Sequence, residues 1–180
     1  MIDATHPYAE NITHTLRAVC DECRTPYVRL LREQEPIYGE SVANLNEMIA
    51  LLNTNDAVIL STLGSKSVHA LCAVRNFQQR IWLRILPSAD AALACRKFGF
   101  QHVIEAKGPF SVADNMMHLR QSGAEILLTK ESGRIGGYPE KCEAAKNMNV
   151  RVLTLRRPAD SGLSYEAVAA RLLRMKEGAE

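Results

Sequence analysis

Short apolar segments alternate with amphipathic segments along most of this chain. The apolar segments predict strands at residues 57–61, 81–86, 102–105, 125–129 and 151–155. Apolar residues that recur at helical spacing predict helices at residues 66–74, 89–98, 111–121, 139–148 and 164–175. Strands and helices that alternate in this way are typical of a parallel sheet with helices on both faces. We therefore predict a five-stranded, parallel, doubly wound (Rossmann-like) α/β domain over residues 35–180.

The N-terminal part of the chain carries a shorter pattern of the same kind. A helical pattern runs from Pro7 to about Cys23, and residues 27–31 have the composition of a strand. Residues 33–39 are polar and contain a proline, so we predict a linker there. A helix over residues 41–52 is predicted to follow the linker.

Polar turns follow four of the predicted strands. These turns comprise residues 62–66, 86–88, 107–111 and 129–141. Because parallel strands end at the same edge of a sheet, the turns meet where open α/β sheets bind their ligands. Glycines in the turns let the backbone approach a ligand, and the free N–H groups of a helix's first turn attract anions. With Lys66, Lys130 and Lys141 nearby, we predict a glycine-lined rim that binds an anionic ligand.

Each turn also has a simpler explanation. Ser65, Ser88 and Ser111 are good helix N-caps, and the glycines of residues 133–137 suit a tight connection without a ligand. Asp3 would likewise serve as a cap for the first helix. The four turns together favour a ligand site more strongly than any one of them alone.

Composition and charge exclude several classes of protein. The chain has 180 residues, of which 47% are hydrophobic and 23% charged, so it can bury a core without a disulfide or a metal. The net charge of +2 is too small to indicate nucleic acid or a membrane surface as a partner. No apolar run approaches the ~20 residues of a membrane helix. Five cysteines without a signal peptide are typical of the reducing cytoplasm, where we expect the protein.

Motifs for nucleotides and metals are weak or absent in the sequence. Neither a GxGxxG fingerprint nor a P-loop is present. Cys20-x-x-Cys23 has no second Cys or His pair, and zinc sites need four ligands. We therefore predict no metal site.

Three motifs stand out in order along the chain. They are Asp3-Ala-Thr-His-Pro-Tyr-Ala9, Gly108-Pro-Phe-Ser111 with Asn115, and Thr129-Lys-Glu-Ser-Gly133 with Gly136-Gly137 and Glu140-Lys141. Further matches are Thr62-x-Gly64-Ser65-Lys66, Arg84-x-Leu86-Pro87, Ala144-Ala145 and Arg156-Arg157-Pro158. With these residues the chain resembles the precorrin-6A reductases, a family that includes the cobalt-precorrin-6A reductases, over nearly its whole length.

The resemblance implies a cytoplasmic oxidoreductase of cobalamin biosynthesis. Such an enzyme uses NADPH or NADH to reduce a double bond of a macrocyclic tetrapyrrole, by adding a hydride and a proton. The implied cofactor contacts are Asp3, Thr5, His6, Pro7, Gly108, Phe110 and Ser111. The implied substrate contacts are Thr62, Ser65, Lys66, Lys130, Ser132, Gly133, Gly136, Gly137, Glu140 and Lys141. No residue is identified as catalytic, and neither the choice of cofactor nor the presence of cobalt in the substrate is readable.

One departure from the family concerns the N-terminus. Members of the family carry further residues, including a glycine-rich turn, before the motif that begins at Asp3. Residues 1–34 are therefore expected to be a partial N-terminal α/β domain, completed by a missing segment, by dimerisation or by a second chain. Two alternative functions stay open: a non-catalytic α/β module that binds a tetrapyrrole or another anionic metabolite, and a sugar-phosphate or nucleotide-dependent transferase.

Overall fold

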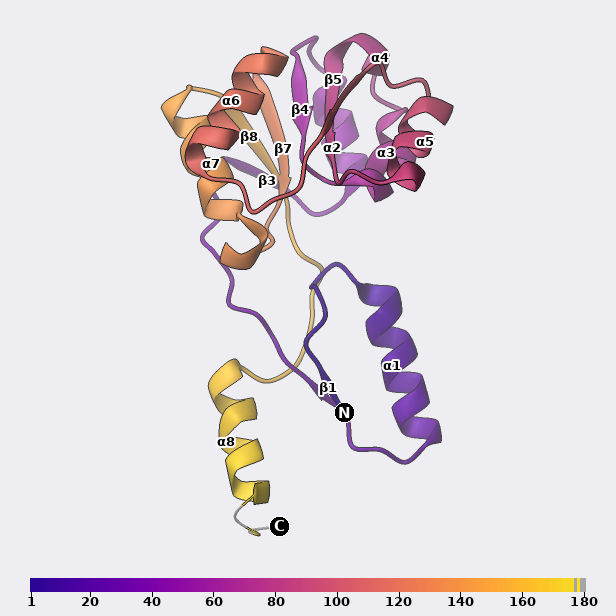
Figure 1. The fold of residues 1–180 in the computed structure, drawn as a ribbon, viewed down its shortest axis with the longest axis vertical. Coiled ribbons are helices and arrows are strands. Elements are labelled where there is room, and N and C mark those ends of the chain that lie inside the picture. Colours follow the sequence, from indigo (N-terminus) through magenta and orange to yellow (C-terminus); the bar gives the residue numbers. More distant parts are fainter. Residues whose placement is uncertain (177, 179–180) are drawn as a thin grey trace. The chain divides into compact units, whose positions relative to one another are not determined.

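The computed structural model describes residues 1–176 and 178, and the chain forms two compact units. Unit 1 combines Met1–Gln34 with the segment that begins at Arg157, and unit 2 is Glu35–Arg156. The positions of the two units relative to one another are not determined, and Figure 1 shows the course of the chain through each of them. None of the helices in the described part of the chain is long and apolar enough to cross a membrane.

Unit 1 contains a two-stranded parallel sheet and two long helices. Its elements are β1 (Ile2–Asp3), α1 (Glu10–Glu22), β2 (Val28–Arg29) and α8 (Tyr165–Lys176). The segment before α8 belongs to this unit because Leu163 forms a parallel bridge with Leu30, and Asp160 pairs with Arg29 at 2.7 Å. Unit 2 therefore ends earlier than the predicted domain 35–180.

Unit 2 is built on a six-stranded, entirely parallel sheet. Its strands are β3 (Glu40–Val42), β4 (Ile59–Ser61), β5 (Ile81–Ile85), β6 (His102–Glu105), β7 (Ile126–Lys130) and β8 (Arg151–Leu155). Its helices are α2 (Leu45–Leu52), α3 (Val68–Leu71), α4 (Phe77–Arg80), α5 (Ala89–Lys97), α6 (Val112–Ser122) and α7 (Tyr138–Asn147), with short 3-10 turns η1 (Ser65–Ser67) and η2 (Arg134–Gly136). The parallel α/β prediction is confirmed.

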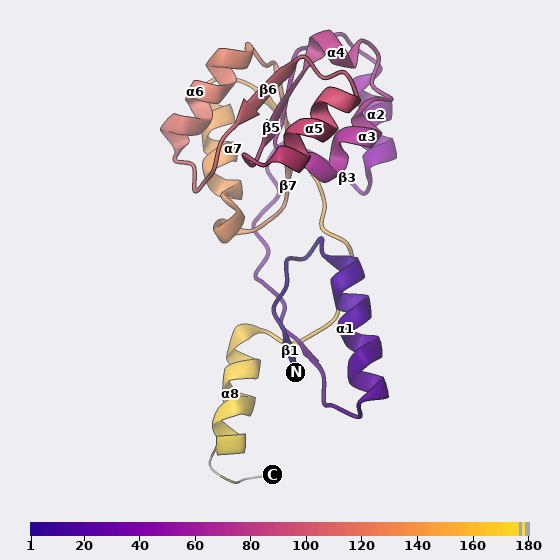
Figure 2. The ribbon, with the colours of Figure 1, turned by 45° about the vertical axis from the view of Figure 1, so that its right-hand side comes forward.

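The strand order β3-β8-β7-β4-β5-β6 determines where a ligand can bind. From β4 the chain runs outward to β5 and β6, and it then crosses through α6 to β7 and β8 on the other side. The switch point lies between β4 and β7, where the connections after two adjacent strands leave in opposite directions. Figure 2 shows α6 and α7 on one face of the sheet, and α2, α3 and α5 on the other.

The core under α6 and α7 is packed around Tyr138. The residues buried with it are Leu60, Ile104, Leu119, Ala124, Leu127, Cys142, Ala144, Ala145, Val150 and Val152. The Tyr138 hydroxyl lies 3.1 Å from Thr154 Oγ1 and accepts a hydrogen bond from the Tyr38 backbone at 3.0 Å. Burial raises the pKa of Tyr138 to about 12, so its phenol is neutral at physiological pH.

Two predictions about unit 2 were wrong at its beginning and in its first crossover. The sheet has a sixth strand, β3, which pairs with β8 within the region predicted as linker and helix. Helix α2 starts at Leu45 because the Asn44 side chain caps it, accepting from Glu47 N at 2.9 Å. The single helix expected over 66–74 is a 3-10 turn followed by the short α3, and α4 was not predicted.

Glu131, directly after β7, contacts both places where the chain passes into and out of unit 2. Its backbone N–H donates to Leu155 O at 3.1 Å, at the end of β8. Its carboxylate accepts from the Glu35 backbone at 3.1 Å, at the first residue of the unit. The two chain ends of unit 2 are therefore held beside one residue.

Candidate functional site

A cavity of ≈ 620 Å³ lies at the carboxyl ends of the central strands of unit 2. It is lined by Thr62 and Gly64 after β4, Arg84, Ile85 and Leu86 at the end of β5, Ala106, Gly108, Pro109 and Phe110 after β6, and Arg134, Ile135, Gly136, Gly137, Glu140 and Lys141 at η2 and the start of α7. Parallel sheets bind ligands at this edge, next to the switch point. We therefore take this cavity as the candidate site.

Arg84 is a buried cation in the wall of the cavity. Its Nη1 donates to Asn115 Oδ1 at 2.7 Å and meets His118 Nδ1 at 3.2 Å, and both partners lie on α6. The Phe110 ring covers the guanidinium, with 4.2 Å between Cζ and the ring centroid. Within residues 1–176 and 178, no carboxylate forms an ion pair with Arg84. Burial lowers the pKa of Arg84 to about 10, so it keeps its charge at neutral pH.

Burial and the contact with Arg84 together keep His118 neutral and fix which ring nitrogen carries its proton. A guanidinium can only donate hydrogen bonds, so His118 Nδ1 must accept one. Burial, and after it the charge of Arg84, lower the pKa of His118 below its usual 6.5. His118 is therefore a neutral ring at neutral pH, with its proton on Nε2.

Two lysines add positive charge around the cavity. Lys141 is buried and donates from Nζ to Gly136 O at 2.9 Å. Burial, and after it the charge of Arg84, lower the pKa of Lys141 to about 8. At the end of β7, burial and then the charge of Lys66 lower the pKa of Lys130. The lowered pKa values show that keeping these two lysines charged in the protein is less favourable than keeping them charged in water.

The glycine-rich turn after β7 is tightly folded. Gly133 and Gly137 have φ values of +71° and +66°, which residues other than glycine rarely adopt. A Cβ added at Gly136 would collide with the side chain of Ser132. Ser132 Oγ and Glu140 Oε2 are buried without a hydrogen-bond partner in the described chain, which is unusual for buried polar atoms.

The cavity brings together only part of the predicted substrate set. Thr62, Gly136, Gly137, Glu140 and Lys141 line it, whereas Ser65, Lys66, Lys130, Ser132 and Gly133 lie outside its lining. Thr62 Oγ1 is engaged with Leu128 O at 2.8 Å. Ser65 and Lys66 are exposed in η1, and no side chain caps that turn. The substrate contacts of all ten residues stay predictions.

The predicted cofactor residues after β6 have different local roles. Gly108 and Phe110 line the cavity. Ser111 caps α6: its Oγ accepts from Asp114 N at 3.1 Å, and the Asp114 carboxylate accepts from Ser111 N at 2.9 Å. This reciprocal capping box is the simpler explanation that the sequence left open for Ser111.

The N-terminal turn of unit 1 is held by the buried carboxylate of Asp3. Asp3 accepts hydrogen bonds from Thr5 N (3.0 Å), Thr13 Oγ1 (2.9 Å), Tyr27 OH (2.7 Å) and Arg29 Nη1 (2.9 Å). Burial alone would raise the pKa of Asp3, but the hydrogen bonds from Thr5, Tyr27 and Thr13 outweigh it and hold the pKa well below its usual range. The carboxylate therefore has a structural role within unit 1.

The prediction that helix α1 starts at Pro7 was wrong by three residues, and Asp3 does not cap the helix. The N-cap is Ala9, which makes no side-chain capping bond, and the helix begins at Glu10. Residues 7–8 form a turn instead, closed by a hydrogen bond from Ala9 N to His6 O at 2.8 Å. Pro7 is buried in this turn, and His6 is half-buried with Nδ1 accepting from Tyr8 N at 3.3 Å. Cofactor contacts of Thr5, His6 and Pro7 stay a prediction.

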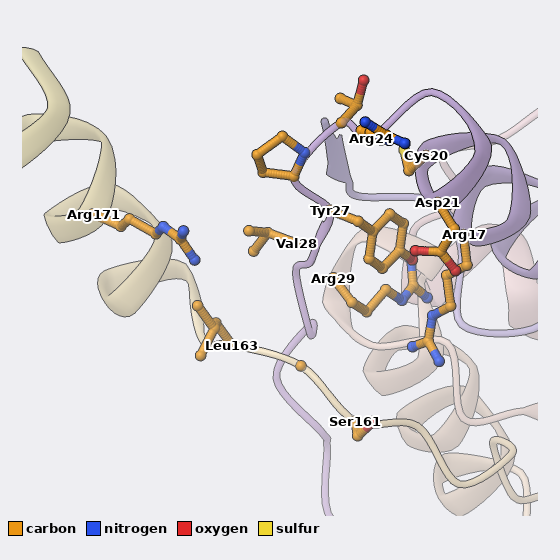
Figure 3. Close-up of a pocket in the computed structure, with 13 residues that line it drawn as sticks. Arg17, Cys20, Asp21, Arg24, Tyr27, Val28, Arg29, Ser161, Leu163 and Arg171 are labelled. Atoms are coloured by element: carbon orange, nitrogen blue, oxygen red, sulfur yellow. The ribbon is translucent and has the colours of Figure 1, made fainter. Parts of the chain in front are cut away.

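A larger and more open hollow, of ≈ 890 Å³, lies in unit 1 (Figure 3). Figure 3 shows Arg17, Asp21, Tyr27 and Arg29 gathered on one side of it and Arg171 on the other. Two of the four arginines that line it have a carboxylate partner: Asp160 contacts Arg29 at 2.7 Å and Arg17 at 3.7 Å. Since Arg29, the buried one of the four, is paired inside the protein, the smaller cavity of unit 2 is the stronger candidate for an anionic ligand.

The cysteines form neither disulfides nor a metal cluster in the described chain. All five are free, and Cys20 is buried whereas Cys23 is exposed. Within residues 1–176 and 178, no three His, Cys, Asp or Glu side chains gather in a way that could hold a metal ion.

The sequence motifs contained Arg84, but we did not predict it as a site residue. The available signal was an arginine inside an otherwise apolar strand, Ile-Trp-Leu-Arg-Ile. A charged residue in a buried strand of a parallel sheet needs a partner, and α6 supplies Asn115 and His118.

Comparisons with known proteins agree with this fold and these motifs. The chain is 33% identical to a cobalt-precorrin-6A reductase of Methanothermobacter thermautotrophicus over 93% of its own length and 57% of that protein's. It is 31% identical to a cobalt-precorrin-6A reductase of Salmonella typhimurium and 32% identical to a precorrin-6A reductase of Rhodococcus erythropolis, over 88% of this chain and 62% of each relative. The chain thus spans roughly three-fifths of the relatives it matches.

A solved structure and a family profile complete the comparison. The structure of a CobK precorrin-6A reductase superposes with a TM-score of 0.78 at 22% identity, over 96% of this chain and 71% of that one, which supports the fold. The profile of the family described as "Precorrin-6x reductase CbiJ/CobK" matches residues 1–174. The resemblance in the motifs is confirmed, and the chain belongs to the precorrin-6x reductase (CbiJ/CobK) family.

Proposed function

We propose that this chain forms the greater part of a precorrin-6A or cobalt-precorrin-6A reductase, an oxidoreductase that reduces one carbon–carbon double bond of a tetrapyrrole. The observation that carries the proposal is the cavity of unit 2, where Arg84 and Lys141 supply buried positive charge and form no ion pair with a carboxylate among the described residues. A precorrin carries many carboxylates, so a cationic cavity lined by glycines suits it. Family membership makes this substrate class the first to test.

In this proposal the residues of the chain bind and orient the ligands. The hydride is supplied by NADPH or NADH when that cofactor is bound. The turn of Thr5, His6 and Pro7, held by Asp3, is assigned to the cofactor side, and the loop from Lys130 to Lys141 to the carboxylates or phosphates. Gly108 and Phe110 contribute backbone and an aromatic face at the cavity wall. Reduction then depends on orientation of two ligands and exclusion of water, and no side chain is assigned as the proton donor.

The direct test is reduction of cobalt-precorrin-6A or precorrin-6A by the purified chain. We expect the nicotinamide absorbance of NADPH or NADH to fall in step with formation of a product that has gained one hydride and one proton. The metal-free and cobalt-containing substrates, each with either cofactor, would establish both preferences. Absence of turnover with all four combinations would contradict reductase activity of this chain on its own.

A non-catalytic binding module is the second candidate. The observation that favours it is that the cation-rich cavity is built by unit 2 alone, whereas Asp3 and Ser111 of the predicted cofactor set are occupied by hydrogen bonds within the chain. Titration with NADPH, NADH and a tetrapyrrole separates the two candidates. A module would bind the tetrapyrrole without either dinucleotide.

A further inference from the structure

The geometry points to Arg84 as the residue that binds a carboxylate of the ligand in the cavity, through the edge formed by its Nε and Nη2 atoms. The site is inferred from the N–H groups of Arg84 that form no hydrogen bond. Only the identity of the ligand rests on the proposed function. The inference assigns a role to a residue that the motifs alone left without one.

The hydrogen bonds of Arg84 leave one edge of the guanidinium unused. Both bonds, to Asn115 and His118, pass through Nη1. Within residues 1–176 and 178, neither Nε nor Nη2 forms a hydrogen bond. These two nitrogens present parallel N–H groups along one side of a planar fork, which matches the two oxygens of a carboxylate. Because Arg84 lines the cavity, a ligand there can meet this edge.

Arg80 shows what a purely structural buried arginine looks like in the same unit. Arg80 and Arg84 are 5% and 6% exposed, so their burial is equivalent. All three nitrogens of Arg80 donate to protein acceptors: Nε to Ala57 O, Nη1 to Arg75 O, and Nη2 to Leu52 O, at 2.9–3.1 Å. The free edge of Arg84 is therefore not a general consequence of burying an arginine in this fold.

The surroundings of Arg84 keep its charge available. Its partners Asn115 and His118 are neutral, and Phe110 covers one face. Asp114, the acid whose charge acts on Arg84, is engaged by the backbone and side chain of Ser111. Glu140 also lines the cavity but forms no ion pair in the described chain. An incoming carboxylate would therefore meet an uncompensated cation in a site of reduced solvent access, where charge pairs are stronger than in water.

The same edge could accept two oxygens of a phosphate, so the test separates the sources. Citrate represents a small carboxylate, uroporphyrin a tetrapyrrole rich in carboxylates, and orthophosphate and NADPH the phosphate source. Their affinities are measured at constant ionic strength for the wild type and for Arg84→Lys, which keeps a cation but loses the fork. Arg84→Met is a second variant, and Arg75→Lys is the control, because Arg75 is exposed and pairs with Asp56 at 2.8 Å. Fluorescence of Trp82, the single tryptophan, checks that unit 2 of each variant is folded.

We expect both Arg84 variants to bind citrate and uroporphyrin at least about tenfold more weakly, with Arg75→Lys unchanged. Orthophosphate and NADPH should change less than twofold. Wild-type affinity in a folded Arg84→Lys, or a wild type that binds neither carboxylate probe, would overturn the inference. Loss confined to orthophosphate and NADPH would overturn the choice of carboxylate. Binding of citrate through Arg84 without binding of uroporphyrin would leave the inference standing and count against the proposed function.

Discussion

Arg29 of unit 1 and Arg84 of unit 2 are both buried, but Arg29 meets two carboxylates and Arg84 meets none within the described chain. Arg29 contacts Asp3 at 2.9 Å and Asp160 at 2.7 Å. Arg84 contacts an amide, a neutral imidazole and an aromatic ring. Among the described residues, Lys141, near Arg84, donates only to a backbone carbonyl, that of Gly136.

The difference separates charge that holds the fold from charge that is available to a ligand. Burial of an ion costs several kcal/mol, which a close partner with good hydrogen bonds largely offsets. Unit 1 offsets that cost internally, so its cluster contributes to structure. Unit 2 leaves the cost in place around a cavity, and such sites are frequently functional.

The largest expected effect comes from removing the Asp3 carboxylate that pairs with Arg29 in unit 1. Asp3→Asn leaves Arg29 with a single, partly exposed carboxylate, and we expect unit 1 to lose about 3–5 kcal/mol of stability. Urea unfolding followed by far-UV circular dichroism measures the loss, while Trp82 fluorescence reports on unit 2 alone. The control is Asp21→Asn, which removes an exposed carboxylate from α1 of the same unit. A loss below about 1 kcal/mol in Asp3→Asn would contradict a structural role for the pair.

Low pH should remove the stabilisation by the Asp3 carboxylate without a mutation. Because the pKa of Asp3 is lowered in the folded state, its stabilising effect is complete above the unfolded pKa of roughly 4 and declines as the pH falls further. The gap in unfolding free energy between the wild type and Asp3→Asn should therefore narrow below that pH. A gap that stays constant down to pH 2 would mean that the carboxylate is not the origin of the difference.

A smaller effect, of opposite sign, is expected in unit 2. Lys141→Met removes a buried charge, and we expect it to stabilise unit 2 at pH 7 by up to about 3 kcal/mol, less the lost bond to Gly136. Between about pH 8 and 10.5 the unfolded wild type binds more protons than the folded one, so the wild type gains stability and the advantage of the variant shrinks. Unfolding monitored by Trp82 fluorescence across this range measures it. Lys146→Met, an exposed change in the same helix, should be close to neutral, and a destabilised Lys141→Met would contradict the comparison.

The smallest effect concerns Ser111, which caps α6 and is also a predicted cofactor contact. Ser111→Ala removes the capping box of α6, so we expect unit 2 to lose about 1 kcal/mol. If capping is its whole role, citrate binding through Arg84 should change less than twofold. Ser111→Asn, which keeps a capping side chain, should restore most of the stability. A tenfold loss of NADPH binding in both variants would instead support the cofactor contact.

The sequence predicted five strands of the sheet better than the edge strand β3 and the site. Strands β4 and β7 begin with apolar residues that are buried, as a strand covered on both faces requires. Strand β3 was missed because Glu40-Ser41-Val42 has no apolar run and pairs only at the edge, with β8. The grouping of the C-terminal helix with unit 1 depends on Leu163 and Asp160, whose partners lie more than a hundred residues earlier in the chain. The free edge of Arg84 depends on which nitrogen α6 occupies, and spacing in the sequence does not encode that.

The two contacts of Glu131 have a consequence for the order in which the chain can fold. Unit 1 is assembled from two pieces of chain, and unit 2 is the continuous segment between them. Closing a loop of that length in an unfolded chain costs about 5 kcal/mol in entropy. Once unit 2 has folded, Glu131 holds its first residue, Glu35, and its last residue but one, Leu155, so the two pieces of unit 1 leave it from neighbouring points. Unit 2 is thus an inserted domain, and its folding lowers the entropic cost of bringing the two pieces of unit 1 together.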